Sequence, residues 1–205
     1  MPILSRRAAL ALALSATPAI ALAQAGTQAG PARIRGTIVR FAGEALEVAA
    51  RDGARTTVTL PRDATIAALR RVTLADIKPG TNVGVVAEPD SDGALRATAI
   101  TVLPPGAQIR QLQSPWDTGA NASMNNGVVE ATVANGSGRD LTLTILGRDV
   151  LVRVPATTPL LMPVPASRED LKPDATVFIN ATRGADGRVT ASRVIVSRDG
   201  VAPVI

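Results

Sequence analysis

The sequence of 205 residues predicts an all-β fold built from two tandem five-stranded barrels. Three observations support this prediction. Short alternating or apolar runs are separated by turn residues at hairpin spacing. A block of motifs recurs along the chain at a fixed offset, which indicates an internal repeat. After the first two dozen residues, no segment is apolar for long enough to span a bilayer as a helix.

Two motifs define the repeat. The segment Asp-Ile-Lys-Pro at 76–79 recurs as Asp-Leu-Lys-Pro at 170–173, and the pair Asp-Gly at 92–93 recurs at 186–187. Both shifts equal 94 residues, from 76 to 170 and from 92 to 186. The chain is therefore expected to contain one β unit twice, with each copy folded around its own aliphatic interior.

Five strands are expected in each copy. Turns such as Ala42-Gly43 separate them, because glycine accepts the positive φ that hairpin turns need. The strands are expected at 33–39, 45–50, 55–60, 82–87 and 94–103 in the first copy, and at 127–133, 141–146, 150–154, 176–181 and 188–196 in the second. The first interior is expected to hold Ile34, Ile38, Leu46, Val48, Val58, Leu60, Val83, Val85, Ile100 and Val102.

A short helical turn is expected between the third and fourth strands of each copy. A hydroxyl residue followed three positions later by a carboxylate matches a capping box, and a nearby proline prevents the helix from continuing. These residues are Thr73, Asp76, Lys78 and Pro79 in the first copy and Ser167, Asp170, Lys172 and Pro173 in the second. A structural role is favoured for them over catalysis. Five strands with a helix before the fourth match an OB-like barrel, and a small sandwich is the alternative.

The motif set resembles a known bacterial family. Its parts are Gly-Thr-Ile at 36–38, Leu-Glu-Val at 46–48, Val-Thr-Leu-Pro at 58–61, Leu-Ala-Asp-Ile-Lys-Pro-Gly at 74–80 and Asp-Gly-Ala-Leu-Arg-Ala at 92–97. Together they are similar to the secreted repeats grouped as domain of unknown function 5666, over both copies. The resemblance implies a small β-barrel outside the cytoplasm and no catalytic residues to carry over. Some similar proteins are connected with metal transport across a membrane, but no spanning segment is found here.

The first 23 residues are expected to be a cleavable export signal. Arg6 and Arg7 form a basic start, residues 8–16 are apolar, and the small residues at 21–23 offer a cleavage site. The stretch around the arginines also resembles a twin-arginine signal. The mature chain is expected in the periplasm or outside the cell, without a transmembrane segment. Its parts are a flexible segment at 24–32, a first barrel at 33–103, a connector at 104–125 and a second barrel with a C-terminal tail at 126–205.

The composition excludes most catalytic chemistry. The chain has no Cys and no His, so it lacks a thiol nucleophile and the commonest general base and metal ligand. No Gly-x-Ser-x-Gly or Ser-x-x-Lys motif is present. Asp90-x-Asp92-Gly93 resembles the start of a calcium loop, but the later ligands are missing and a plain turn is favoured. We therefore expect no enzyme, no cofactor and no metal site.

A nucleic-acid partner is not expected either. The formal charge is +5, from 22 basic and 17 acidic side chains, and the high isoelectric point reflects missing Cys, His and Tyr rather than a basic surface. Barrels that bind single strands stack bases on aromatic side chains within a basic groove. Here the aromatic residues are Phe41, Phe178 and Trp116 alone.

The connector contains the candidate binding residues, which are Trp116, Asp117, Asn121 and Asn125. The indole can serve as a stacking surface, and the aspartate and the asparagines can form hydrogen bonds to a ligand. The favoured alternative is that Trp116 anchors the connector between the barrels. Two hypotheses follow for function. The protein is either an interaction module that binds another envelope protein or itself at this connector, or a binder of a small ligand or metal ion associated with transport.

Overall fold

A computed structural model describes residues 29–50, 53–135 and 138–204. The expected export signal at 1–23 lies outside the described residues. The described chain contains strands and two 3-10 turns but no α-helix, which confirms the all-β class. Accordingly, no helix in this part of the chain has the length and apolar character needed to cross a membrane.

The strands follow the repeat closely. The first half contains β1 (Gly30–Ala42), β2 (Ala45–Ala50), β3 (Arg55–Thr59), β4 (Thr65–Arg71), β5 (Asn82–Pro89) and β6 (Leu95–Val102). The second half contains β8 (Ser123–Asn135), β9 (Gly138–Ile145), β10 (Arg148–Pro155), β11 (Leu160–Pro165), β12 (Thr176–Arg183) and β13 (Val189–Val196). The connector contributes β7 (Leu112–Pro115). Strands β4, β7 and β11 are additional to the ten that the sequence predicts.

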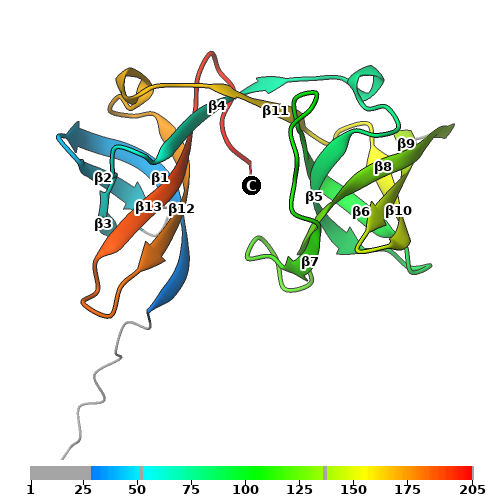
Figure 1. Cartoon of the computed structure of the whole chain (residues 1–205), viewed down its shortest axis with the longest axis horizontal. Coiled ribbons are helices and arrows are strands. Elements are labelled where there is room, and N and C mark those ends of the chain that lie inside the picture. Colours follow the sequence, from blue (N-terminus) through cyan, green and yellow to red (C-terminus); the bar gives the residue numbers. More distant parts are fainter. Residues whose placement is uncertain (1–28, 51–52, 136–137, 205) are drawn as a thin grey trace, which may run out of the picture.

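The strands close into two rings of five, and each ring draws strands from both halves of the chain (Figure 1). The first ring joins β1, β2 and β3 to β12 and β13, and parallel pairing of β3 with β13 closes it. The second ring joins β8, β9 and β10 to β5 and β6, and parallel pairing of β10 with β6 closes it. The expectation that each copy folds around its own interior is therefore wrong.

Strands β4 and β11 carry the chain from one ring to the other. β4 runs parallel to β13 at its start and then antiparallel to β11, which in turn runs parallel to β6. Both strands bury apolar side chains, including Leu69 of β4 and Leu161 and Met162 of β11. Pairing of the two crossing strands satisfies their backbone groups and removes these side chains from water. One continuous sheet of thirteen strands results.

Each ring encloses an aliphatic interior that mixes the two copies. The first interior contains Ile38, Leu46, Val48, Val58 and Leu60 with Val177, Ile179, Val194 and Val196. The second contains Val83, Val85, Ile100 and Val102 with Val129, Leu141, Leu143 and Val152. Nine of the ten residues expected in one interior are buried and Ile34 is half-buried, but the four from β5 and β6 belong to the other ring.

The two 3-10 turns, Leu74–Asp76 and Arg168–Asp170, are built alike. The backbone N–H of the preceding residue, Thr73 or Ser167, donates to the aspartate Oδ2 at 2.8 Å in both turns. Hydrogen bonds from Thr73 hold the pKa of Asp76 below its usual value. Each turn leads into the strand that enters the opposite ring, β5 or β12, so the turns fix where the exchanged strands begin.

Candidate functional site

The connector forms a hairpin tip that reaches from the second ring to the first. β7 pairs antiparallel with the start of β8, and the backbone N–H of Trp116 donates to the carbonyl of Ala122 at 2.8 Å. Asp117 accepts two hydrogen bonds from the guanidinium of Arg35 on β1, at 2.7 and 3.0 Å. These bonds and the nearby charge of Arg33 lower the pKa of Asp117. Asp117 thus fixes the tip to the first ring.

Asn125 supports the hairpin from inside. It is completely buried, and its Oδ1 accepts from Nε2 of Gln113 on β7 at 2.8 Å. Its Nδ2 donates to Oγ of Ser123 at 2.9 Å and to the carbonyl of Val85 at 3.3 Å. The side chain therefore ties β7, β8 and β5 together, and its polar atoms are used within the protein. Asn121 is exposed in the loop between β7 and β8.

Trp116 lies where the two rings meet. Its ring is 6.2 Å from that of Phe178 on β12, with the planes tilted by 43°, and the guanidinium of Arg33 lies 4.0 Å from the indole centroid. Trp116 also packs beside a small cluster of buried residues contributed by both rings and by the crossing strands β4 and β11, namely Leu69, Val86, Ala99, Leu161, Phe178 and Ile195. The indole is half-buried, and its Nε1 is covered by protein without a hydrogen-bond partner.

A groove of about 520 Å³ opens beside Trp116. Residues from both rings, from the crossing strand β11 and from the connector line it, so it belongs to the junction of the rings rather than to either interior. Its lining includes the side chains of Arg33, Arg110, Trp116, Phe178, Asn180 and Arg193. Asn121 and Asn125 are not part of the lining, although Asn126 is. Of the four candidate binding residues, only Trp116 lines this groove.

Among the charged residues that line the groove, Arg193 stands out because it is half-buried and has no ion pair among the described residues. It is half-buried on β13, opposite Asn180 of β12. Its Nε has no hydrogen-bond partner, and none of the ion pairs found among the described residues includes it. Burial lowers the pKa of its guanidinium. A buried donor without an acceptor costs folding free energy, so its presence needs an explanation beyond packing.

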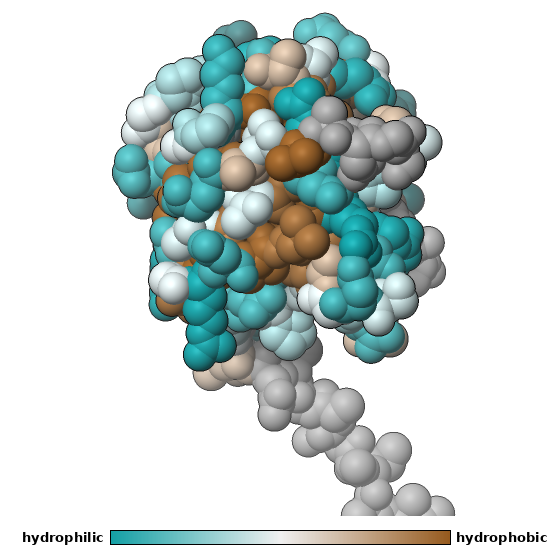
Figure 2. Space-filling model, turned by 90° about the vertical axis from the view of Figure 1, so that its right-hand side faces the viewer, coloured by the Kyte–Doolittle hydropathy of each residue, from teal (hydrophilic) through white to brown (hydrophobic). Residues whose placement is uncertain are grey.

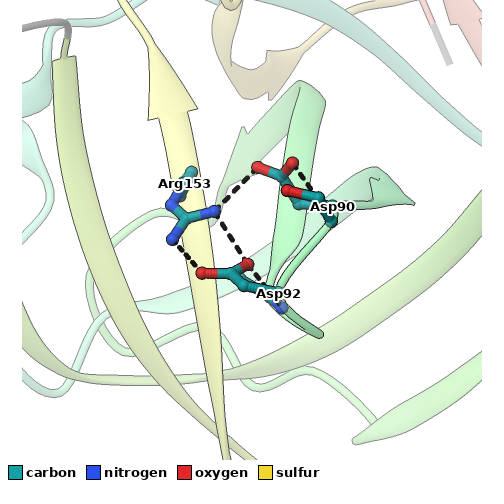
Figure 3. Close-up of polar contacts among 5 residues, drawn as sticks. Asp90, Asp92 and Arg153 are labelled. Atoms are coloured by element: carbon teal, nitrogen blue, oxygen red, sulfur yellow. Dashed lines mark hydrogen bonds and ion pairs between the residues drawn. The ribbon is translucent and has the colours of Figure 1, made fainter.

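A second polar cluster joins the halves of the chain away from the groove (Figure 3). Arg153 of β10 donates to Asp90 at 2.9 Å and binds Asp92 through both of its terminal nitrogens. These hydrogen bonds lower the pKa of both aspartates and raise that of Arg153. The residues that resemble the start of a calcium loop thus hold the β5–β6 turn to the strand that closes the second ring.

The described residues contain no group of three or more Asp or Glu side chains placed to hold a metal ion. The described lining of the groove includes amide and hydroxyl groups but no carboxylate, the charged oxygen ligand that hard cations commonly use. Comparison with protein-family models, curated proteins and solved structures finds no match to the chain.

Sequence reasoning missed most of the groove. Phe178 and Arg193 lie on two of the predicted strands, but the predicted interior covers the first copy alone, and no facing was assigned to either residue. The missed signal is alternation, because Phe178 lies between the interior residues Val177 and Ile179 and must face outward. A large aromatic residue on the outer face of a small ring indicates that something packs there.

Proposed function

We propose that the protein is a non-enzymatic, exported binding protein of the cell envelope and that the groove between its rings is the ligand site. The sequence pattern that predicts an export signal at 1–23 supports the location outside the cytoplasm. The resemblance to domain of unknown function 5666, which we retain as a proposal, is consistent with it. The single structural observation behind the ligand site is the groove of about 520 Å³ at the ring junction, whose described lining combines three arginines with Trp116 and contains no Asp or Glu side chain.

The size and lining of the groove favour a small ligand over a protein surface. Its volume of about 520 Å³ lies within the range of small-molecule sites, and apolar side chains are combined with a few polar ones. Each unpartnered buried donor costs about 1–3 kcal/mol. Binding sites often retain such destabilising groups, because a site optimised for function is not optimised for stability.

The test is to purify the full protein under native conditions from the envelope of cells that produce it. Native mass spectrometry should then show the mass of the chain without residues 1–23 and an added small-molecule mass that disappears on denaturation. Trp116→Leu, which removes the indole from the lining of the groove, should reduce the bound fraction. The matched control is Phe41→Leu on β1, away from the groove, which should retain it. A ligand-free mass together with no thermal stabilisation by any fraction of an envelope extract would refute the proposal.

A second candidate function is an interaction module that binds another envelope protein or a second copy. A surface away from the groove supports it. Figure 2 shows apolar side chains among polar ones on the outer side of the second ring. The large exposed hydrophobic residues there are Val133, Leu146 and Leu151, which are 62%, 66% and 41% exposed. Binding of another envelope protein or of a second copy would cover them.

Leu151→Lys tests this second candidate. Sedimentation of the wild-type protein should show self-association that increases with concentration and is lost in the variant. Thr57→Lys, at the equivalent position of the first ring, is the control and should behave as wild type. Monomeric wild-type protein at every concentration would exclude the second copy as the partner and leave only a different envelope protein.

A further inference from the structure

We infer that the groove binds an organic anion, with Arg193 pairing the charged group and Trp116 and Phe178 contacting an apolar body. This inference rests on the proposed function and adds the chemical class of the ligand. It starts from the charges around the groove. Three arginines, Arg33, Arg110 and Arg193, line it, and no Asp or Glu side chain does. The acidic side chain of the connector tip, Asp117, pairs with Arg35 at 2.7 Å and more loosely with Arg33 at 4.0 Å, so Arg110 and Arg193 are the lining arginines without an ion pair among the described residues.

Arg193 is the group best placed to select an anion. A guanidinium without a carboxylate partner in a half-buried position retains its charge but has lost part of its hydration. A carboxylate or phosphate would supply the missing countercharge, and the planar guanidinium can bind either through two hydrogen bonds. Asn180, opposite Arg193 on β12, can donate to the same group through its amide, whereas Nδ2 of Asn126 already donates to the carbonyl of Arg110 at 3.2 Å.

The remaining lining suits the apolar part of such a ligand. Trp116, Met124 and Ile109 are partly exposed and present apolar surface, whereas Phe178 and Ile195, which also line the groove, are only 2% and 3% exposed. An inorganic anion would leave this surface in water, whereas a neutral apolar ligand would leave Arg193 unpaired. A carboxylate or phosphate attached to a chain or ring of carbon atoms satisfies both parts of the groove.

Space for the ligand comes from a difference between the two copies. Gly84 and Ala99, on β5 and β6, occupy the positions equivalent to Phe178 and Arg193 under the shift of 94 residues. A Cβ atom at Gly84 would lie 3.0 Å from Oδ1 of Asn126, so even a small side chain there would crowd the groove. One copy thus provides the room and the other provides the aromatic ring and the charge.

The experiment measures binding of four probes to the purified full protein, by calorimetry and by the emission of its single Trp. Decanoate and decyl phosphate carry both features, decanol carries only the apolar chain, and inorganic phosphate carries only the charge. Decanoate or decyl phosphate should bind at least tenfold more tightly than decanol and than inorganic phosphate. The stronger of the two anions identifies the preferred head group.

Arg193→Met should reduce anion binding at least tenfold, to the level of decanol, whereas Arg193→Lys should retain part of it. Arg188→Met, at the exposed start of β13 and outside the groove, is the matched control and should bind as wild type. If Arg193→Met does not fold, Arg110→Gln at the exposed rim should still weaken the anions selectively.

Equal affinity for decanol and decanoate, an unchanged Arg193→Met variant, or no binding of either anion would overturn the inference. The proposed function would stand in those cases if native mass spectrometry of the envelope-purified protein shows a neutral bound molecule. It would fall together with the inference if no bound molecule is found.

Discussion

The two surfaces that meet between the rings come from equivalent strands but have opposite character. On β5 and β6 the outward positions hold Gly84 and Ala99, and on β12 and β13 they hold Phe178 and Arg193. The inward positions of the same strands remain aliphatic in both copies, as Val83 and Val177 illustrate. Packing inside a ring therefore limits variation, while the outward positions are free to differ. The groove exists because they differ.

The outer surfaces of the rings show a second difference of this kind. In the first ring Glu47 of β2 pairs with Arg40 and Arg55, at 3.7 and 3.2 Å. In the second ring the equivalent central position is Thr142, whose cross-strand neighbours are Ala131 and Leu151. The first ring thus carries ion pairs at a central outer position where the second ring has apolar neighbours, which is why we place a protein contact on the second ring only.

The largest expected effect concerns the exchange of strands, and the absence of natural cysteines makes it directly testable. Thr59 of β3 is the register partner of Thr190 on β13. If each copy closed its own ring, Thr59 would instead be paired with Arg96 on β6. Thr59→Cys combined with Thr190→Cys should form a disulfide within one chain, because neighbouring strands bring Cα atoms within bonding range.

The control for this cross-link is Thr59→Cys combined with Arg96→Cys, which should remain reduced. Non-reducing electrophoresis and intact mass distinguish the two pairs in dilute protein. Efficient linkage of the control pair, with none in the first, would show that the copies close separately.

The next largest effect is expected for the aromatic side chain of Phe178 at the junction of the rings. Phe178→Ala should lower the free energy of unfolding by about 3–5 kcal/mol, because this ring is 2% exposed and its removal leaves a cavity between the rings. Urea unfolding measures the change. Phe41→Ala, at a half-buried position of β1, should cost clearly less, and equal losses at the two positions would contradict the packing described here.

A smaller effect of opposite sign is expected for the charge of the groove. Arg193→Met should raise the free energy of unfolding by about 1 kcal/mol, because it removes an unpartnered buried donor and keeps the length of the side chain. Thermal unfolding without added anions is the measurement. Destabilisation by the variant would mean that Arg193 has a structural partner after all.

The smallest expected effect is on the pH dependence of stability, and it concerns the ion pairs of Arg153, which are found where the second ring closes. Hydrogen bonds to Arg153 depress the pKa of Asp90 and Asp92 in the folded protein. Their stabilising contribution is therefore present above about pH 4, the usual range of an aspartate, and is lost as the pH falls through the depressed values. The first ring has Thr59 where the second has Arg153.

Arg153→Thr, which copies the first ring, should accordingly make the stability less dependent on pH in acid. The melting temperatures of variant and wild type should differ above about pH 4 and converge below it. A constant difference across the whole range would assign the effect of Arg153 to packing instead.

The sequence predicted the strands and the aliphatic positions well, because period-two alternation and glycine turns depend on neighbouring residues. It did not predict which copy completes which ring. β3 pairs with β13 of the second copy, but β6 of the first copy has the same alternation and could pair with β3 in the same way. The sequence pattern is therefore identical for the two arrangements. The deciding segments, β4 and β11, are short apolar runs without clear alternation.

The sequence predicted only part of the candidate site, because it reveals residues that are locally unusual but not how the rings come together. Trp116 and Asp117 stood out because the connector is not repeated, and both contact the first ring. Arg33 and Arg193 did not stand out, since an arginine on the outer face of a strand is ordinary. Only the arrangement of the rings shows that Arg193 is covered and without a partner.

The exchanged strands also set the order in which the molecule can be completed during synthesis. The second ring needs β5, β6 and β8 to β10, the last of which ends at Pro155. The first ring begins with the earliest strand yet waits for β13, which ends at Val196. The amino-terminal hairpins therefore emerge long before the partners that shield their apolar faces. A cell that makes this protein must protect them during that interval, and their long-range pairing makes the final closure slow.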